Sequence, residues 1–226
     1  GSFWAVYGNV VVKGASLLAS ILIARLLGSS NFGELAVIKT TLSVFSLFAT
    51  FGLGVSITKF VAECRNNNVK DLGNIIAAAN TITISTGLFF GLLLVGFAPL
   101  ISIRILHAES LIIPLRISGV YLFFNALNVY QVGVIAGLEA FRELARINLI
   151  IGIITLPVLL TTTYLLGLNG TLAGLTINLI INWFLNKLLI RKRISELNVI
   201  FSYSSRREDI LRLLRFSYPL ALKEII

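Results

Sequence analysis

The chain of 226 residues has no methionine, one cysteine, one histidine and 10 acidic residues. Its single cysteine, Cys64, cannot form a disulfide within the chain. His107 stands alone, and no cysteine–histidine cluster has the spacing of a metal site, so we expect no metal and no cofactor. Because position 1 is not methionine and the apolar run from Phe216 stops after eleven residues, we expect a part of a longer membrane protein.

Charged residues are also scarce, at 13% of the chain against about 25% in an average soluble domain. Apolar residues make up 57%, and the mean hydropathy is +0.92. One globular core of this length cannot bury so many apolar residues, because much of any folded surface faces solvent. The composition therefore excludes a soluble enzyme, a disordered tail and a disulfide-rich secreted domain, and it indicates a protein embedded in lipid.

Six segments hold the roughly 20 mostly apolar residues that a spanning helix needs. They are too long and too uniformly apolar for the alternating strands of about 10 residues found in a membrane barrel. The sequence therefore predicts an all-α, polytopic membrane protein with six transmembrane helices and the start of a seventh. The predicted spans are residues 3–27, 36–58, 74–98, 112–136, 147–168 and 170–190.

These spans divide the chain into a transmembrane lobe (residues 1–190), a cytoplasmic linker (191–215) and the truncated start of a seventh helix (216–226). Within the linker, Ser205 and Glu208 have the spacing of a helix capping box, ahead of an amphipathic stretch. Two interpretations of this short basic helix stay open. It lies on the inner leaflet, or it is a solvated linker that joins two lobes.

The formal net charge is +9, and its distribution predicts the orientation. Residues 59–70, 142–146 and 187–215 carry 13 Lys and Arg, whereas the loops between them carry three. Because cytoplasmic loops are enriched in Lys and Arg, the basic segments and the N-terminus are expected in the cytoplasm. The positive charge is thereby explained without nucleic acid, and no nucleic-acid partner is expected.

Lys13 lies ten residues into the first span, about 15 Å deep and close to the bilayer centre. An ionisable group at that depth usually faces an interior cavity. Polar residues at steps of three and four place further side chains on the same helical face in this and other spans. These stripes are Asn9, Lys13, Ser16 and Ser20, then Lys39, Ser43, Ser46 and Thr50, then Tyr121, Asn125, Asn128 and Gln131.

Aspartate occurs only at Asp71 and Asp209, both in predicted loops, so no central acid is available to bind a proton or a sodium ion. A cavity with lysine and no acid favours an anion such as phosphate or pyrophosphate. In the sixth span, Asn178, Asn182 and Asn186 either hydrogen-bond neighbouring helices or line the cavity, and joining helices is the favoured interpretation. The triplet at residues 52–54, Gly-Leu-Gly, indicates close packing or a helix bend.

Four short stretches resemble one family. Residues 24–33 read ARLLGSSNFG, similar to the ARLLG…FG signature of bacterial and archaeal polysaccharide transporters, which flip lipid-linked oligosaccharides. Residues 51–63 contain FGLG and TKFVAE, which resemble the family's GL…TRFVAE, with lysine where arginine is common. Residues 137–142, GLEAFR, resemble the inner loop between the fourth and fifth helices, and residues 216–220, FSYPL, resemble the start of the seventh.

The resemblance implies the superfamily that includes multidrug and toxic compound extrusion transporters and the peptidoglycan lipid flippase. Such proteins have two six-helix lobes, related as parallel repeats, around a central cavity. This chain is then the N-terminal lobe of a two-lobe exporter fold. The family's cationic cavity residues correspond to Lys13, Arg25 and Lys59, with Lys39 as a further candidate. For Arg25 and Lys59, helix anchoring at a span end stays open as the alternative.

The expected function is to flip a polyprenyl-pyrophosphate-linked oligosaccharide by alternating access, without enzyme chemistry, for cell-surface polysaccharide biosynthesis. The expected location is the plasma membrane of a bacterium or archaeon, with the bilayer and a polysaccharide polymerase as further partners. One alternative is a cation-coupled multidrug exporter of the same fold, which needs a central carboxylate. Another is a non-transporting membrane scaffold, which leaves Lys13 without a purpose. A membrane glycosyltransferase is the least favoured alternative, because few acidic residues are present.

Overall fold

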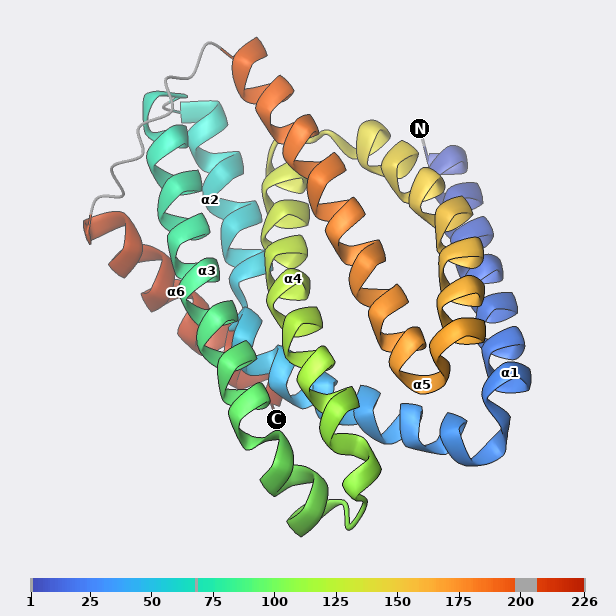
Figure 1. The fold of residues 1–226 in the computed structure, drawn as a ribbon. Coiled ribbons are helices and arrows are strands. Elements are labelled where there is room, and N and C mark those ends of the chain that lie inside the picture. Colours follow the sequence, from blue (N-terminus) through green and yellow to red (C-terminus); the bar gives the residue numbers. More distant parts are fainter. Residues whose placement is uncertain (1, 68, 198–206, 226) are drawn as a thin grey trace.

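A computed structural model describes residues 2–67, 69–197 and 207–225, and these ranges contain helices and no strand. Figure 1 shows the arrangement of the helices. The main helices are α1 (Ser2–Thr50), α2 (Leu53–Asn67), α3 (Val69–Leu100), α4 (Ile112–Gly137), α5 (Phe141–Glu196) and α6 (Arg207–Ile225). A π-helical turn (η1, Ile101–Ile105) and a short 3-10 turn (η2, Glu109–Leu111) connect α3 to α4.

The predicted class of helical membrane protein is confirmed, but the predicted number of spans is not. In the described ranges, four helical runs are long and apolar enough to cross a membrane. They are Ala19–Arg65, Asp71–Ile105, Glu109–Gly137 and Phe141–Glu196. The number of helical runs is lower than the number of predicted spans because helix continues on both sides of Gly28 and Gly167, where the sequence predicted separate spans. Lipid favours this continuity, since a helix satisfies its own backbone hydrogen bonds.

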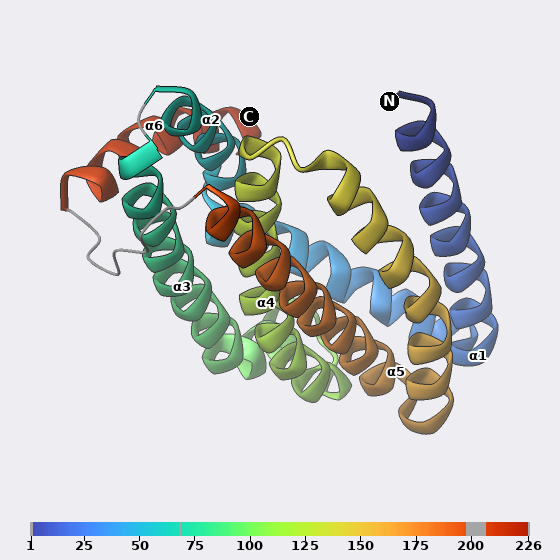
Figure 2. The same ribbon diagram turned by 90° about the horizontal axis from the view of Figure 1, so that it is seen from above.

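Two glycines nevertheless change the direction of the chain inside these runs. Gly28 has φ 74° and ψ 172°, and Gly167 has φ 57° and ψ −130°, which are conformations that glycine adopts without steric cost. The ribbon turns sharply at both places (Figures 1 and 2). At Gly167, α5 folds back into a hairpin of a first limb, residues 141–166, and a second limb, residues 168–196.

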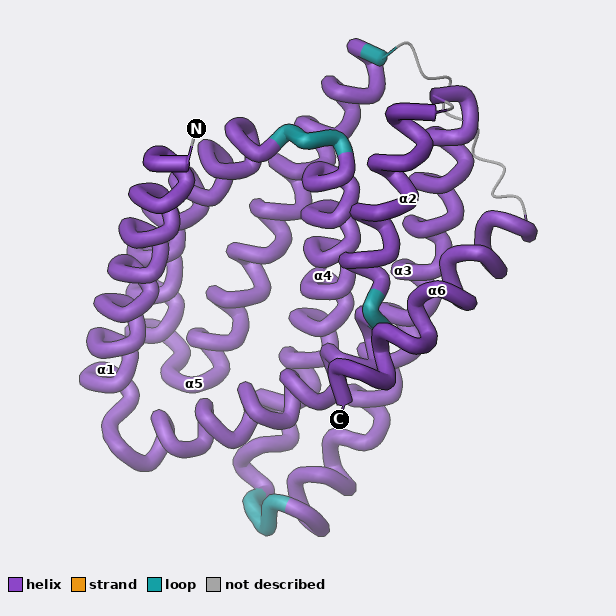
Figure 3. Tube along the Cα trace, turned by 180° about the vertical axis from the view of Figure 1, so that it is seen from behind, coloured by secondary structure: helices purple, strands orange, loops and turns teal. Residues whose placement is uncertain are grey.

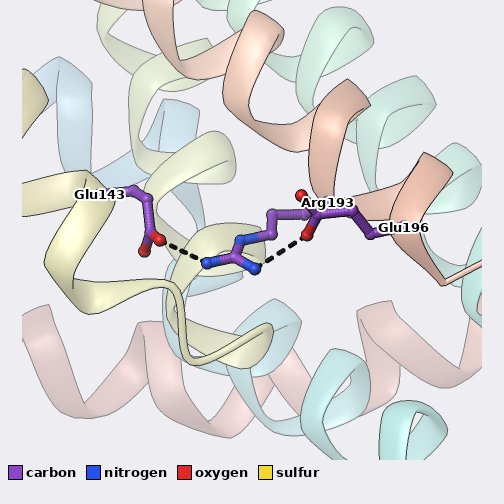
Figure 4. Close-up of polar contacts among 3 residues, drawn as sticks. All are labelled: Glu143, Arg193 and Glu196. Carbon is purple, nitrogen blue, oxygen red and sulfur yellow. Dashed lines mark hydrogen bonds and ion pairs between the residues drawn. The ribbon is translucent and has the colours of Figure 1, made fainter.

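Contacts between the limbs of α5 hold this hairpin together. Arg193, near the end of the second limb, pairs with Glu143, in the first turn of the first limb (Figure 4). A straight helix would place residues 50 positions apart about 75 Å from each other. Near the turn, the hydroxyls of Thr163 and Thr171 lie 3.0 Å apart and are buried. The two limbs therefore meet at the turn and again at their far ends.

The break between α1 and α2 divides the predicted second span. Phe51 and Gly52 both have positive φ, 46° and 65°, which ends one helix and redirects the next. Two residues further on, Gly54 meets Gly133 of α4, where an added Cβ on Gly133 would lie 2.7 Å from the Gly54 carbonyl oxygen. The interpretation of the Gly-Leu-Gly triplet as a bend and a close contact is confirmed.

Helix α4 lies at the centre of the bundle, between α3, α5 and α2 (Figures 1 and 2). Its buried side chains belong to two apolar clusters. One cluster joins α2, α3, α4, α6 and the second limb of α5 around Ile57, Ile76 and Ile135. The other joins the second part of α1 to α3, α4 and α5 around Leu94 and Leu122. Helix α4 therefore contributes buried side chains to both clusters.

The segments predicted to share one side of the membrane lie at one end of the bundle, here called the basic end. Arg65 at the end of α2 pairs with Glu139 before α5, at 2.8 Å. Arg212 of α6 pairs with Glu63 of α2 at 3.7 Å, and Arg193 joins the two ends of α5 there. The turns η1 and η2 lie at the opposite end (Figure 1). Which membrane face the basic end occupies stays a prediction.

Helix α6 is one continuous helix across the predicted linker helix and the predicted start of the seventh helix. Leu213 is fully buried, and the Ser217 hydroxyl donates to the Ser56 hydroxyl of α2 at 2.7 Å. Figure 3 shows α6 beside α2. The described part of this segment is therefore docked on the bundle. Ser205, the predicted cap, lies outside the described residues, and the domain boundaries stay predictions.

Candidate functional site

The first predicted stripe falls largely outside the described side chains. Asn9, Lys13 and Ser16 belong to α1, but their side chains are not among those that the structure describes. Ser20 is described and half-buried. The cavity role of Lys13 therefore stays a prediction, based on its depth in the first span.

Arg25 lies one turn before the bend at Gly28 and is exposed. It borders an open hollow of about 490 Å³ together with Thr161 and Tyr164 of the first limb of α5. The remaining lining is leucine. A cation beside a threonine and a tyrosine hydroxyl fits a polar or anionic ligand group, and a helix-anchoring role fits the same position.

The second stripe is partly occupied by hydrogen bonds inside the bundle. Lys39 is exposed, and the Ser43 hydroxyl donates to the Lys39 carbonyl at 2.9 Å. Asn125 of α4 donates its amide to the Ser46 hydroxyl at 2.8 Å, so two predicted cavity residues are brought together. Thr50 donates to the Ser46 carbonyl at 2.8 Å. The contact between Asn125 and Ser46 joins α4 to the second part of α1.

Amides of α4 join it to the second limb of α5. Asn128 donates to the carbonyls of Phe124 and Leu179, and Gln131 donates to the carbonyl of Trp183 at 3.1 Å. Both amides are buried, and their side-chain oxygens receive no hydrogen bond from any residue in the described ranges. These two oxygens are therefore enclosed acceptors without a donor among the described residues.

A hollow of about 410 Å³ lies at the break between α1 and α2, and we call it the break hollow. Its polar lining comes from Thr50, Thr58 and Asn128, and the other lining residues are glycine, alanine and valine. The Thr58 hydroxyl contacts the carbonyls of Gly54 and Gly133, at 2.9 and 3.2 Å. Small residues and neutral polar groups make this surface suited to hydroxyl-rich ligands.

Lys59 follows the break hollow in sequence and contacts α6. Its ammonium lies 4.0 Å from the ring centroid of Phe216 and 3.9 Å from the carboxylate of Glu63. Arg212 lies 4.9 Å over the Phe60 ring and shares Glu63 with Lys59. Both cationic side chains are about half exposed, at 46% and 59%. Two cations beside one carboxylate leave net positive charge facing outward.

The sequence analysis missed the role of Arg212 and Phe216 at this contact. The pairing of α2 with α6 joins positions far apart along the chain, and no local spacing encodes it. The Lys59 ammonium joins two helices through an aromatic ring, and its cavity role and its anchoring role both stay predictions.

The described interior of the bundle is polar without being charged. Its buried polar side chains are serine, threonine, asparagine and glutamine, and no Asp, Glu, Lys, Arg or His is buried in the described ranges. No group of three His, Cys, Asp or Glu side chains that could hold a metal occurs there either. Neutral hydrogen-bonding groups therefore lie inside, and the described cations lie at the surface.

Comparison with known proteins gives one match of full length. A family model described as polysaccharide biosynthesis protein matches residues 1–226. The chain belongs to this family. No curated protein and no solved structure matches the chain.

Family membership confirms the resemblance that the sequence motifs indicated. Together with the four apolar helices, it makes this chain a membrane protein with a role in polysaccharide biosynthesis. Within that role, the arrangement of Arg25, Lys39 and Lys59 is informative. The three cations lie in three separate surroundings, beside the first limb of α5, on the second part of α1, and against α6.

Proposed function

We propose that this member of the polysaccharide biosynthesis family moves a polyprenyl-pyrophosphate-linked oligosaccharide across the membrane by alternating access. It acts as a translocase, without enzyme chemistry and without a cofactor. The single observation that carries the proposal is the division of polar groups in an apolar helix bundle. The described interior offers neutral amides and hydroxyls, and the described cations are exposed or half-buried around it.

This division fits the chemistry of the substrate. Sugars present many hydroxyls and no charge, so Ser46, Asn125 and Asn128 can exchange hydrogen bonds with them. The pyrophosphate carries the negative charge, and a lysine ammonium binds phosphate as a point charge. Lys13 near the centre of the first span, with Arg25, Lys39 and Lys59, supplies that charge in the proposal. The polyprenyl tail needs no protein site, because it stays in the bilayer.

Alternating access requires a second lobe that moves against this one. In the proposal, α6 transmits that motion. Its buried Leu213 and its hydrogen bond from Ser217 to Ser56 fix it on the first lobe. The contact of Lys59 with Phe216 also holds α6 against α2. A pyrophosphate near Lys59 would compete with Phe216 for the lysine ammonium. Binding of the pyrophosphate is thereby coupled to the movement.

The test is export of surface polysaccharide in a strain that lacks the full-length gene and is complemented with variants. Lys13→Ala is expected to reduce export strongly, and Lys13→Glu is expected to abolish it, because it places a negative charge where the pyrophosphate binds. Lys192→Ala is the matched control. Lys192→Ala removes one positive charge, as Lys13→Ala does. Lys192 is exposed, lies beyond the predicted sixth span and is outside the polar stripes, so its replacement is expected to leave export unchanged.

Expression level and detergent-extracted monodispersity are measured for each variant, so that a folding defect is recognised. Reconstituted vesicles then show whether labelled lipid-linked oligosaccharide reaches the opposite leaflet. Full export by both Lys13 variants would refute the pyrophosphate role of this lysine. Drug resistance conferred by the intact gene, with normal polysaccharide in its absence, would refute the proposed substrate class.

A further inference from the structure

A further groove lies over α4, between α3 and the second limb of α5. Helix α4 packs extensively on both neighbours, whereas α3 and α5 hardly touch each other. The groove encloses a cavity of about 460 Å³. We call it the α3–α5 groove. Helices α2 and α6 lie on the opposite side of α4 (Figures 2 and 3), so this groove faces away from the joint with a second lobe.

The lining of the α3–α5 groove changes from basic to apolar along its length. At the basic end it begins with Arg191 and Lys187, followed by Trp183 one turn deeper. Its deeper part is lined by Ile180 of α5, Ile84 of α3 and aromatic residues of α4. A charged entrance, an indole and an apolar interior follow one another in the order found across a membrane interface.

The length of the groove matches one leaflet. Its lining on α5 extends from Ile180 to Arg191, which is eleven residues or about 16 Å of helix. The hydrocarbon core of a bilayer is about 30 Å thick, so one leaflet contributes about 15 Å. A groove that starts at the interface and ends near the bilayer centre has the dimensions of a single acyl chain with its headgroup.

The two cations at the entrance differ from the other basic residues nearby in their partners. The Lys187 ammonium lies 4.6 Å from the ring centroid of Trp183, and neither Lys187 nor Arg191 pairs with any carboxylate in the described ranges. Arg193, two residues further on, is held by Glu143 and Glu196 (Figure 4). The positive charge of Lys187 and Arg191 is therefore available to a phosphate, whereas that of Arg193 is not.

Gln131 of the third polar stripe also belongs to the groove lining. It lines the cavity, is 3% exposed, and uses its amide nitrogen on the Trp183 carbonyl. Its side-chain oxygen accepts no hydrogen bond from the part of the chain that the structure describes.

We propose that the α3–α5 groove binds one acidic glycerophospholipid from the leaflet at the basic end. Its phosphate lies between Lys187 and Arg191, and one acyl chain runs along Ile180 and Ile84 toward the centre of the membrane. Basic pockets between transmembrane helices recognise acidic headgroups in this way. The lipid is a structural ligand, distinct from any transported substrate, and the proposal does not depend on the proposed function.

The test uses the full-length protein in nanodiscs and the fluorescence of Trp183. Trp4→Phe leaves Trp183 as the tryptophan of this chain. Nanodiscs of phosphatidylcholine contain a small fraction of brominated lipid, either phosphatidylglycerol or phosphatidylcholine, because bromine quenches an adjacent indole. Brominated phosphatidylglycerol is expected to quench more strongly than brominated phosphatidylcholine at the same fraction. Unbrominated phosphatidylglycerol is expected to reverse the quenching, and inorganic phosphate is not.

The double variant Lys187→Gln, Arg191→Gln is expected to lose this preference. Each basic residue near a membrane surface contributes about fivefold in affinity for acidic lipid, so the double variant loses about 25-fold. Lys192→Gln removes one positive charge outside the groove lining and is expected to keep the preference. Equal quenching by the two lipids, or a preference retained by the double variant, overturns the proposal. The competition with unbrominated lipid needs no charge variant, so it remains decisive if the double variant misfolds.

Discussion

Replacing Gly170 by alanine tests the hairpin of α5 most directly. Gly170 is in the second limb, three residues after the turn, and is buried. A Cβ added to it would lie 1.8 Å from the Thr162 carbonyl oxygen of the first limb, whereas real Cβ contacts below 3.0 Å are essentially absent. The limbs must therefore separate by 3.0 minus 1.8, or 1.2 Å, to accommodate one methyl group.

The expected loss of stability follows from that displacement. Overpacking of this kind costs about 1–3 kcal/mol. Separating the limbs also weakens the hydroxyl contact between Thr163 and Thr171, which is worth about 0.6 kcal/mol for a hydrogen bond inside a membrane bundle. Alanine regains about 0.5–1 kcal/mol over glycine within a helix. The net destabilisation of Gly170→Ala is therefore about 1–3 kcal/mol.

Gly96→Ala is the matched control, because Gly96 is a helical glycine of α3 that is exposed and has nothing within 4 Å of an added Cβ. It is expected to leave stability unchanged or to raise it by up to about 1 kcal/mol. The assay is equilibrium unfolding of the full-length protein in mixed micelles of SDS and a mild detergent, followed by circular dichroism. If both alanine variants unfold at the same SDS fraction, the limbs of α5 do not pack as described and the reasoning fails.

Two further predictions concern the same helix. The first uses variants in which Cys64 is replaced by alanine and a single cysteine replaces Asn169 or Leu197. The two cysteines are expected to react with an impermeant maleimide from opposite sides of the membrane, because the two limbs of a hairpin cross it twice. Labelling of both positions from the same side would contradict this expectation. A double-mutant cycle of Glu143→Gln and Arg193→Gln is expected to give a coupling free energy of about 0.2–1 kcal/mol, since both side chains are about a third exposed. The coupling should shrink in high salt, and a salt-independent value would show that it is not electrostatic.

Composition alone predicts the helical membrane class, because lipid leaves helices and closed barrels as the only spanning structures and the apolar runs are too long for strands. The number of helical runs depends on individual residues. Ser29 and Asn169 interrupt the hydropathy, so the sequence predicts loops there, yet helix resumes directly after Gly28 and Gly167. A glycine at either position can end a helix or bend it, and contacts such as Thr163 with Thr171 decide which occurs.

In the candidate site too, the sequence predicts less than the structure shows. Helical spacing predicts that Ser43 and Ser46 share a face, but it does not predict their partners. In the structure the Ser43 hydroxyl donates to the Lys39 carbonyl of the same helix, whereas the Ser46 hydroxyl accepts from Asn125 of another helix. The contact of Lys59 with Phe216 depends on how α6 docks against α2, which a pattern along one helix does not contain.

The positive charge at the basic end serves more than orientation. A rule that counts Lys and Arg treats all of them alike, but the structure divides them by partner. Arg65 and Arg193 are paired and join segments of the bundle, so their charge is locally neutralised. Lys187 and Arg191 have no carboxylate partner in the described ranges.

A charge that only sets orientation needs no particular neighbours, whereas Lys187 lies over an indole ring beside a groove of one leaflet's depth. Added salt should therefore weaken binding of acidic lipid at Lys187 and Arg191. It should affect orientation little, because orientation is fixed when the helices insert.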